Sequence, residues 1–586
     1  MYLENINGPE DVKKLNLEEL DILAGEIREG LFNRLTKIGG HFGPNFGFVE
    51  ATIAMHYVFN SPKDKFVFDV SHQTYPHKML TGRAYGYIDE ERIMEISGYS
   101  APEESEHDHF IIGHTSTSVS LACGLAKGRD LKNDNENIIA VIGDGSLSGG
   151  EALEALDFAG SELNSNLIII VNDNQQSIAE NHGGLYKNLE ELRNGTAKTN
   201  LFTAFGLDYI YEEEGNNIEK LIKLFQKVKD IDHPIVVHIN TVKGKGYKLA
   251  EENRENWHWA SPFDRKTGKS LIDFGSMEDY TNLTADLLLD KMKSDNKVVA
   301  VAAGVPTSFG FTEEKRIQAG KQFIDVGIAE ENAVGLISEI AKNGGKPVFG
   351  TNSTFIQRTY DQISQDLCIN NNAATIVLGY TSVFGLNDVT HLGIFTISAF
   401  SHIPNLLILA PTNKQEYLSM LNWAVDQNKY PVMLLMPGNG VINDNREGII
   451  DYSNCINKFK VEQQGEKVAL IAAGDFYQIG EQASKLIEEK FGFKPTLINP
   501  RFINDIDKQC LDSLKEKHQL VITLEDGIID GGFGQKIASY LGISNIKVKN
   551  LGLDKEFYDR YDAKQLLENL GITPEKISDL CKLIES

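Results

Sequence analysis

Short runs of apolar, mostly β-branched residues recur along the chain and alternate with stretches of helical periodicity. Residues 138–142 and 167–171 are two such runs, and residues 150–162 between them carry apolar side chains at spacings of three and four. A buried strand, a helix and a second buried strand predict a βαβ unit, in which both strands are parallel and both sheet faces are covered. The same alternation predicts further strands at residues 297–302, 374–378, 406–410, 468–472 and 520–524.

Two polar stretches, residues 250–277 and 437–461, interrupt this alternation and have the composition of linkers. They divide the sequence into three consecutive α/β domains, each with a mainly parallel sheet flanked by helices. We expect these domains to span residues 1–270, 278–440 and 455–586. A chain of 586 residues is long enough for three or four domains of ordinary size.

The charge balance narrows the possible partners. The chain carries 57 basic and 83 acidic side chains, a formal net charge of -26, with 41% hydrophobic and 24% charged residues. This is the composition of a globular protein that repels phosphate backbones, so we expect no nucleic-acid partner. A phosphorylated ligand needs local help from a metal, a helix N-terminus or a few basic groups.

The cysteines and the N-terminal segment indicate the compartment. The five cysteines are far apart and form no CxxC pair, so we expect neither a zinc site nor a disulfide framework. The first residues are polar and acidic, and no apolar run approaches the roughly 20 residues of a membrane span. We therefore expect a cytoplasmic protein without a membrane partner.

Polar residues directly follow the first two predicted strands. Gly143-Asp144-Gly145-Ser146 leads into a helix, whose free N–H groups suit an anion, and the second strand ends at residues 172–176, NDNQQ. A carboxylate beside an anion makes chemical sense if a cation joins them, and Mg²⁺ takes oxygen ligands and bridges phosphates. Either motif alone could be an ordinary turn, but their pairing across one βαβ unit predicts a metal and phosphate site.

This pair of motifs resembles the cofactor motif of thiamine-diphosphate enzymes, and the flanking segments resemble one family in particular, the 1-deoxy-D-xylulose-5-phosphate synthases. The resemblance covers nearly the whole chain. It is carried by GGHFGPNFG at 39–47, FDVSHQTYPHKMLTGR at 68–83, GHTSTS at 113–118, NDNQQSIAEN at 172–181, DVGIAE at 325–330, STFIQRTYDQ at 353–362, PRFI at 500–503 and GGFG at 531–534. We expect GGFG to be the turn that starts a helix.

The resemblance implies a transketolase-like fold, with thiamine diphosphate bound through Mg²⁺. The metal ligands would be Asp144, Asn174 and the backbone carbonyl of Gln176, with Asn172 as the competing candidate for the amide. The residues that would line the diphosphate and thiazolium are His72, Gly113, His114, Thr115, Gly145, Ser146, Asn174 and Tyr247. Each of these could instead be a structural loop residue.

The resemblance also implies the catalytic groups. Glu330 would be the acid that hydrogen-bonds the aminopyrimidine of the cofactor, and Phe355 would stack on that ring. His41 and His391 are candidates for acid–base work on pyruvate, because the pKa of histidine lies near working pH. The alternatives are a solvated glutamate, a core aromatic and structural histidines.

The sequence departs from the family where the phosphate of the acceptor would bind. Tyr380 stands where the family has one arginine, residues 434–439 contain no counterpart of a second, and Asn352 replaces a tyrosine. Asn387 and Asn332 replace an aspartate and a histidine, while Arg358 remains as a substrate-binding candidate. Neutral side chains cannot replace the bidentate, charge-assisted bonds of arginine to phosphate.

The expected activity is that of a transferase acting on pyruvate and an aldehyde. Decarboxylative ligation to glyceraldehyde 3-phosphate would give 1-deoxy-D-xylulose 5-phosphate, an isoprenoid precursor. The alternatives are a related transketolase-type enzyme with a different donor or an unphosphorylated acceptor, and a paralogue that binds the cofactor without catalysis. The resemblance implies a homodimer.

Overall fold

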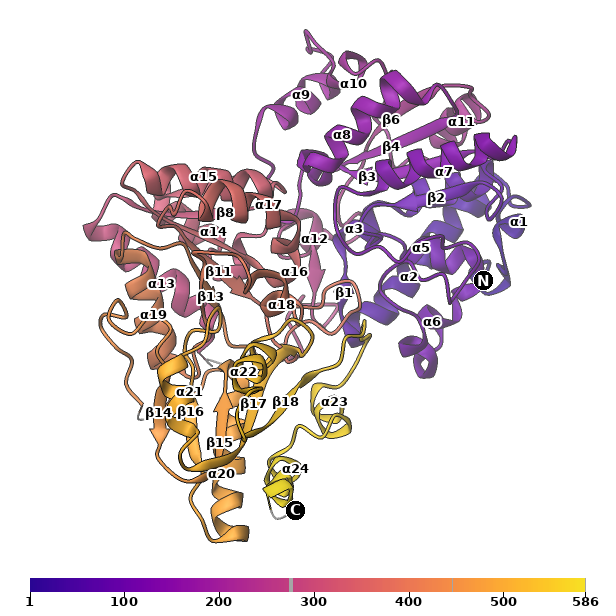
Figure 1. The fold of residues 1–586 in the computed structure, drawn as a ribbon. Helices are drawn as coiled ribbons and strands as arrows, with labels where there is room; N and C mark the ends of the chain where they lie inside the picture. Colours follow the sequence, from indigo (N-terminus) through magenta and orange to yellow (C-terminus); the bar gives the residue numbers. More distant parts are fainter. Residues whose placement is uncertain (273–277, 445, 585–586) are drawn as a thin grey trace. The chain divides into compact units, whose positions relative to one another are not determined.

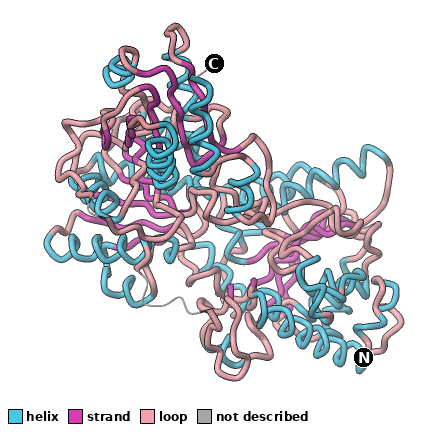
Figure 2. Tube along the Cα trace, turned by 90° about the horizontal axis from the view of Figure 1, so that it is seen from below, coloured by secondary structure: helices cyan, strands magenta, loops and turns pink. Residues whose placement is uncertain are grey.

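The structure, a computed structural model, describes residues 1–272, 278–444 and 446–584. It divides into two compact units. Unit 1 comprises Met1–Ser276 with Gly327–Ala329, and unit 2 comprises Met277–Val326 with Glu330–Ser586. In both units the strands lie inside layers of helices (Figure 2).

Unit 1 is built on a five-stranded parallel sheet of order β2-β3-β4-β6-β5. The strands are β2 (Lys65–Phe68), β3 (Ile138–Gly143), β4 (Leu167–Asp173), β5 (Asp208–Glu212) and β6 (Pro234–Asn240). The predicted βαβ unit is β3, α8 (Gly150–Phe158) and β4, and every residue of β4 is buried. Gly143 pairs with Asn172 in the register of β3 and β4, so the two sequence motifs start from adjacent strand ends.

Helices cover both faces of this sheet (Figure 1). Ile139 and Val141 of β3 pack in a core with α2 (Leu17–Ile38), α4 (Val49–Val58) and α11 (Ile218–Val228). The alternate side chains of β3 pack in a second core with α7 (Ser118–Lys132) and α8. The shorter helices of unit 1 are α1 (Pro9–Val12), α3 (Gly43–Gly47), α5 (Tyr75–Lys78), α6 (Tyr85–Ile88), α9 (Gly184–Arg193), α10 (Leu201–Ala204) and α12 (Lys248–Glu252).

Unit 2 contains two sheets. The first is parallel, with the order β12-β13-β11-β10-β8-β9. Its strands are β8 (Val298–Ala302), β9 (Phe323–Asp325), β10 (Lys346–Asn352), β11 (Thr375–Gly379), β12 (Leu407–Leu409) and β13 (Val432–Leu435). Its helices are α13 (Tyr280–Ser294), α14 (Glu313–Ala319), α15 (Glu330–Lys342), α16 (Ser353–Ile356), α17 (Tyr360–Gln362), α18 (Thr396–Phe400) and α19 (Lys414–Asp426).

The second sheet of unit 2 has the order β14-β16-β15-β17-β18, with only β14 antiparallel to its neighbour. Its strands are β14 (Lys460–Gln463), β15 (Lys467–Ala472), β16 (Thr496–Asn499), β17 (His518–Ile528) and β18 (Lys547–Leu553). Its helices are α20 (Tyr477–Phe491), α21 (Lys508–Leu514), α22 (Phe533–Leu541), α23 (Ala563–Asn569) and α24 (Pro574–Asp579). One hydrophobic core joins the two sheets, because Phe349 of β10 and Ile471 of β15 belong to the same buried cluster.

The predicted α/β class and its mainly parallel sheets are confirmed, and GGFG does lead into α22. The predicted linkers are partly wrong. Within the first, β7 (Trp259–Ala260) pairs with β1 (Gly40–His41), and within the second, Tyr452 is fully buried. These stretches fold because aromatic side chains anchor an otherwise polar sequence.

The exact domain boundaries stay a prediction. Residues 273–277 and 445 of the predicted linkers, and residues 585–586 of the third predicted domain, lie outside the described residues. Among the helices that the structure describes, none combines the length and the apolar character needed to cross a bilayer.

Candidate functional site

Asp144 lies directly after β3 and is almost fully buried. Burial and the charge of Asp173 raise the pKa of its carboxyl, while a hydrogen bond from Asn181 and the charge of Lys243 act in the opposite direction. The Asn181 Nδ2 atom donates to Asp144 Oδ2 at 2.7 Å. A buried carboxylate with so little compensation from the protein suits a bound cation.

Asp173, at the end of the neighbouring strand β4, is compensated by the protein itself. Burial tends to raise its pKa, but His238 and Arg193 lower it below the ordinary value. His238 Nε2 lies 2.9 Å from Asp173 Oδ2, and Arg193 forms an ion pair with the same oxygen. Asp173 is therefore a structural anion, although it sits between the two candidate amides.

The structure distinguishes Asn172 from Asn174. Asn172 has both ends engaged, because its Nδ2 donates to Gln73 at 3.0 Å and its Oδ1 accepts from the Thr241 hydroxyl at 2.6 Å. The Oδ1 of Asn174 is buried and accepts no hydrogen bond among the described residues. An amide oxygen left open in this way fits a metal ligand. The geometry favours Asn174.

The backbone turns sharply between these amides and the third predicted ligand. Gln175 has a φ of 67° and donates its N–H to Asp173 Oδ1 at 3.0 Å. This turn, an uncommon conformation for a residue with a side chain, follows both asparagines and separates them from Gln176. The carbonyl of Gln176 follows the turn directly, and its role as a ligand stays a prediction.

Two residues that the sequence did not single out complete this group. The Oδ1 of Asn181, like that of Asn174, is buried and has no hydrogen-bond partner among the described residues. The fully buried Lys243 donates to the Ser177 carbonyl at 2.6 Å. Burial lowers the pKa of its amine to about 7, although the negative charge of Asp144 acts to raise it. An amine that gains its charge when an anion arrives suits a phosphate group.

The donor set fits Mg²⁺ with a diphosphate. It consists of one carboxylate and amide oxygens, which is a hard, oxygen-only set that leaves positions for phosphate and water. No three His, Cys, Asp or Glu side chains of the described ranges are grouped as an all-protein metal site would require. Gly145 is needed here, because a Cβ atom at this position would lie 2.7 Å from the Ser177 hydroxyl.

Asp69 holds the predicted 113–118 loop against the Asp144 turn. Its buried carboxylate accepts the N–H groups of Ser116, Thr117 and Ser118 at 2.9, 3.0 and 3.0 Å. Ser116, with a φ of 77°, donates its hydroxyl to the Ser146 carbonyl at 2.8 Å. The structure thus brings the loop with Gly113, His114 and Thr115 to the GDGS turn. Such strained positions cluster at functional sites.

Three histidines of unit 1 form a cluster. The ring of His41 lies 5.1 Å from that of His72 and 5.7 Å from that of His258, and His72 and His258 are stacked at 5.5 Å. Burial, Lys243 and the two other histidines hold the pKa of His258 well below its usual value. His258 escaped the sequence analysis because it lies in a stretch that reads as a linker. The pairing of β1 and β7 brings it to His41.

Tyr247, predicted to line the cofactor, packs in an aromatic core. Its ring lies 5.4 Å from Phe42 and 5.0 Å from Trp257, and its hydroxyl donates to the Arg265 carbonyl at 2.8 Å. Its role toward a cofactor stays a prediction.

In unit 2, Glu330 is the first residue of α15 and is buried. Burial raises the pKa of its carboxyl to about 7, although Arg358 acts to lower it. Arg358 Nη1 lies 3.4 Å from Glu330 Oε2. The residue expected to bind substrate therefore lies beside the predicted acid, where it tunes the charge of that acid. A carboxyl that titrates near neutrality is suited to proton transfer.

Phe355 and His391 also come together in unit 2, with ring centroids 5.8 Å apart. The Thr390 hydroxyl lies 2.8 Å from His391 Nδ1, and Asp388 lies 3.8 Å from the same nitrogen. The loop that carries His391 is fastened by the C-terminal part of the chain. Asn387 Nδ2 donates to the Tyr561 carbonyl at 2.8 Å, and the Asn387 carbonyl accepts from the backbone of Arg560 at 2.7 Å.

The divergent acceptor positions are neutral in the structure. Tyr380 directly follows β11 with a φ of 55°, and its carbonyl accepts from the Ser353 hydroxyl at 2.8 Å. The Oδ1 of Asn352 is buried and accepts no hydrogen bond within the described part of the chain. Neither position offers a cation to a phosphate.

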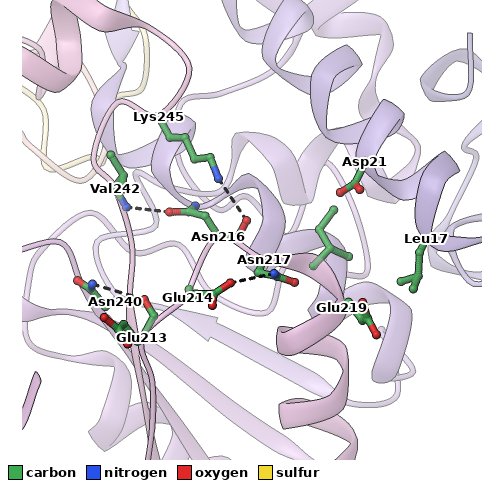
Figure 3. A pocket seen from close by; sticks show the side chains of 12 residues that line it. Leu17, Asp21, Glu213, Glu214, Asn216, Asn217, Glu219, Asn240, Val242 and Lys245 are labelled. Carbon is green, nitrogen blue, oxygen red and sulfur yellow. Dashed lines mark hydrogen bonds between the residues drawn. The ribbon is translucent and has the colours of Figure 1, made fainter. Parts of the chain in front are cut away.

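Unit 1 also contains a surface cavity of about 500 Å³ (Figure 3). It is lined by Leu17, Asp21, residues 213–219, Asn240, Val242 and Lys245, which include none of the predicted site residues. Its wall supports the segment before Lys243, since the N–H of Val242 donates to Asn216 Oδ1 at 2.8 Å. We assign it no ligand.

Comparisons with known proteins identify the class to which the chain belongs. Residues 277–440 match the family model described as the transketolase pyrimidine binding domain, and residues 457–577 match the transketolase C-terminal domain. These matches define the class, a transketolase-type protein. Residues 3–199 and 187–241 match the family model described as 1-deoxy-D-xylulose-5-phosphate synthase.

Similar proteins extend over nearly the full length. The chain is 36% identical to 1-deoxy-D-xylulose-5-phosphate synthase of Clostridium beijerinckii, covering 99% of this chain and 98% of that one. It is 35% identical to the enzyme of the same name from Clostridium acetobutylicum, covering 100% and 99%. A solved transketolase from Leishmania mexicana aligns over 97% of both chains at 15% identity, with a TM-score of 0.44. The chain belongs to the 1-deoxy-D-xylulose-5-phosphate synthase family.

Proposed function

We propose that this chain joins pyruvate to glyceraldehyde 3-phosphate, with loss of CO₂, to give 1-deoxy-D-xylulose 5-phosphate for isoprenoid precursor synthesis. Thiamine diphosphate, bound through Mg²⁺, supplies a nucleophilic carbon and an electron sink for the decarboxylation. The observation that carries the proposal is the pair of donors at adjacent strand ends, where Asp144 has a raised pKa and Asn174 has an unbonded buried oxygen. Both are features that a bound metal would satisfy.

The residues of the chain divide the work. Asp144, Asn174 and the carbonyl of Gln176 would hold the metal, while Lys243 and the loop at 113–118 would hold the diphosphate. Glu330 would exchange a proton with the aminopyrimidine, because its pKa of about 7 lets it hold or release one at working pH. His41, with His72 and His258, would orient pyruvate and move protons at its oxygen atoms.

A second function is favoured by the neutral acceptor positions. Tyr380 and Asn352 offer no positive charge, and Arg358 is engaged with Glu330 at 3.4 Å. An unphosphorylated aldehyde would need no positively charged side chain at the acceptor positions. A competition between glyceraldehyde 3-phosphate and D-glyceraldehyde in one reaction mixture, read as the ratio of the two products, distinguishes the two acceptors.

The proposed mechanism is tested at Glu330. We expect Glu330→Ala to slow pyruvate turnover in the presence of thiamine diphosphate and Mg²⁺ by about 100- to 10,000-fold, the usual contribution of a general acid–base group. Glu331→Ala, at the adjacent and partly exposed carboxylate, is the matched control and should retain turnover. Turnover that stays at the wild-type rate in Glu330→Ala would show that the mechanism is wrong. A wild-type chain that consumes no pyruvate would favour the non-catalytic alternative.

We also propose a homodimer, as the family resemblance implies. Size-exclusion chromatography with light scattering would test it, and a monomer at micromolar concentration would contradict it.

A further inference from the structure

Two loops of unit 2 that carry the divergent acceptor positions meet the C-terminal sheet at a pair of buried carboxyls. The first loop, residues 379–385, follows β11 and contains Tyr380. The second, residues 436–440, follows β13. Asp475 lies in the turn after β15, and Asp526 lies in β17. Both aspartates are at most 9% exposed.

Asp526 holds the first loop. Its Oδ1 accepts the N–H of Val383 at 2.9 Å, and its Oδ2 accepts a hydrogen bond from the Ser382 hydroxyl. Ser382 is itself buried, and its Oγ accepts the N–H of Phe384 at 3.1 Å. The carboxyl thus fixes Ser382 and Val383 directly, and Phe384 through Ser382.

Asp475 holds the second loop and meets the first one at Ser382. Its Oδ2 accepts the N–H of Gly438 at 2.8 Å, and its carboxyl also interacts with the Ser382 hydroxyl. The contact is tight, because a Cβ atom at Gly438 would lie 2.8 Å from the Cβ of Ser382. The larger side chain of another residue at 438 would push the two loops apart.

The number of available protons determines which carboxyl of this cluster is charged. Ser382 has one hydroxyl proton and can donate it to only one carboxylate. The other carboxyl then needs a proton of its own, which it donates to the Ser382 oxygen. Two buried carboxylates around one hydroxyl would also repel each other, so one neutral and one charged carboxyl is the stable combination.

We infer that Asp475 and Asp526 share a single proton through Ser382, and that this cluster positions the two loops at the acceptor end. The two carboxyls are positioning residues, since they act through the loop backbones. The inference deepens the proposed function, on which its kinetic consequence rests. The positioning itself does not depend on that function.

The surroundings agree with a neutral-plus-charged pair. Burial and Asp475 raise the pKa of Asp526, and burial raises that of Asp475. The other titratable groups facing the pair are Tyr280 of α13 and Tyr561, and burial raises the pKa of both phenols, so they stay uncharged. The adjoining cavity of about 30 Å³ has room for about one water, not for a substrate.

Hydrogen–deuterium exchange of the cofactor-free chain tests the positioning without any need for activity. Asp526→Ala removes both bonds to the first loop, and we expect exchange in residues 379–385 and 436–440 to rise about tenfold or more. Asp526→Asn keeps an acceptor for Val383 and a donor for Ser382, and should hold exchange within about twofold of wild type. Asp475→Asn should do the same, because either carboxyl can be the neutral one.

The dependence on pH separates a shared proton from simple packing. Raising the pH from about 6 to about 9 removes the shared proton and leaves two carboxylates in one site, so the loops of the wild-type chain should lose protection after correction for intrinsic exchange. Asp526→Asn has only one carboxylate and should show no such loss. An equal response in wild type and Asp526→Asn would overturn the shared proton.

A neighbouring carboxyl provides the control for general damage to the C-terminal sheet. Glu525 is buried in the same strand, β17, and accepts the N–H groups of Phe533 and Gly534 at the start of α22. Glu525→Ala should lower stability but leave exchange in the two loops unchanged. If Glu525→Ala and Asp526→Ala loosen the loops equally, or if neither does, the positioning role is wrong.

Kinetics then tests the link to the acceptor. In Asp526→Ala we expect the KM for the aldehyde to rise about tenfold or more, with the KM for pyruvate unchanged and rescue in Asp526→Asn. Equal changes in both KM values would overturn the acceptor role. If the wild-type chain consumes no pyruvate, the proposed function fails, while the exchange measurements still decide the positioning.

Discussion

The strand ends of the two units both carry buried carboxyls, but the protein compensates them in different ways. At the end of β3 in unit 1, Asp144 interacts with the charge of Lys243 and with the amide of Asn181, whose oxygen has no partner among the described residues. In unit 2, Asp526 accepts from the Ser382 hydroxyl, with which the Asp475 carboxyl also interacts, and backbone N–H groups donate to both carboxyls. The first arrangement fits the bound cation that we propose, whereas the second fits a single shared proton.

This difference shows how the two regions relate to the family. In unit 1, the ends of β3 and β4 keep the motifs of the family, and their side-chain oxygens without hydrogen-bond partners fit the metal that we propose. In unit 2, the loops at 379–385 and 436–440 lack the positive charges that the resemblance implies, and carboxyls of the C-terminal sheet hold these loops. Conservation of cofactor chemistry and change at the acceptor end can therefore coexist in one chain.

Removing a carboxyl that the protein already compensates should have the largest effect on stability. Asp173→Ala leaves Arg193 and His238 without their buried partner, and we expect the free energy of unfolding to fall by about 3–5 kcal/mol. Chemical denaturation measures it. Asp208→Ala, which breaks the exposed pair with His233, is the control and should cost less than about 1 kcal/mol. Equal losses would mean that burial does not distinguish the two pairs.

A carboxyl that the protein compensates only in part should instead destabilise the folded chain as it ionises. The pKa of Glu330 is raised from 4.5 to about 7, so its favourable contribution is present below pH 4.5 and is lost as the pH rises through about 7. Glu330→Gln stays neutral, and the cofactor-free variant should gain about 3 kcal/mol relative to wild type between those limits. Glu331→Gln should show no such trend. A pH-independent difference would contradict the raised pKa.

A side-chain oxygen without a hydrogen-bond partner should contribute to metal binding and not to the stability of the fold. Asn174→Ala should weaken Mg²⁺-dependent binding of thiamine diphosphate by at least the 10- to 100-fold typical of losing an outer-shell partner. Isothermal titration calorimetry measures it. Asn172→Ala removes bonds to Gln73 and Thr241, so it should lower stability by about 1–3 kcal/mol. The reverse pattern would make Asn172 the ligand.

A positive charge restored at the acceptor end should have the smallest effect. Tyr380→Arg adds a guanidinium, and we expect the KM for glyceraldehyde 3-phosphate to fall about tenfold, the value of one charge-assisted hydrogen bond. The KM for D-glyceraldehyde should not change. Tyr380→Gln, which is neutral, should not improve binding of the phosphorylated substrate. A lower KM for both aldehydes would show that the shape of the new side chain, and not its charge, causes the effect.

The fold was largely predictable because its strands are continuous apolar runs. Buried parallel strands leave a strong local signal, as β4 shows with seven buried residues in succession. The polar composition of 250–272 predicts a linker, because it hides Trp257 and Phe263, whose rings pack against Phe42. The backbone pairing of β7 with β1 also holds this stretch. Such anchoring depends on contacts with residues about 200 positions away, which no local pattern records.

The site was predictable only where residues follow strands or stand in a family motif. Asp144 and Asn174 follow β3 and β4, and Glu330 stands in a recognised segment. Asp69 also follows a strand, β2, and stands in the quoted 68–83 segment, but its role in holding the 113–118 loop shows only in the fold. Lys243 and His258 act in the same region, but each is isolated in the sequence, and only the tertiary fold brings it there. The proximity of Arg358 to Glu330 was likewise unreadable, because the spacing of 28 residues fixes no distance between side chains.

The most direct test of the account is the product formed from isotopically labelled pyruvate and glyceraldehyde 3-phosphate with thiamine diphosphate and Mg²⁺, followed by NMR. We predict consumption of pyruvate, release of CO₂ and a labelled product identified as 1-deoxy-D-xylulose 5-phosphate, all dependent on the metal. Release of CO₂ with ligation only to D-glyceraldehyde would keep the cofactor chemistry and replace the acceptor. No consumption of pyruvate with either aldehyde would contradict the account.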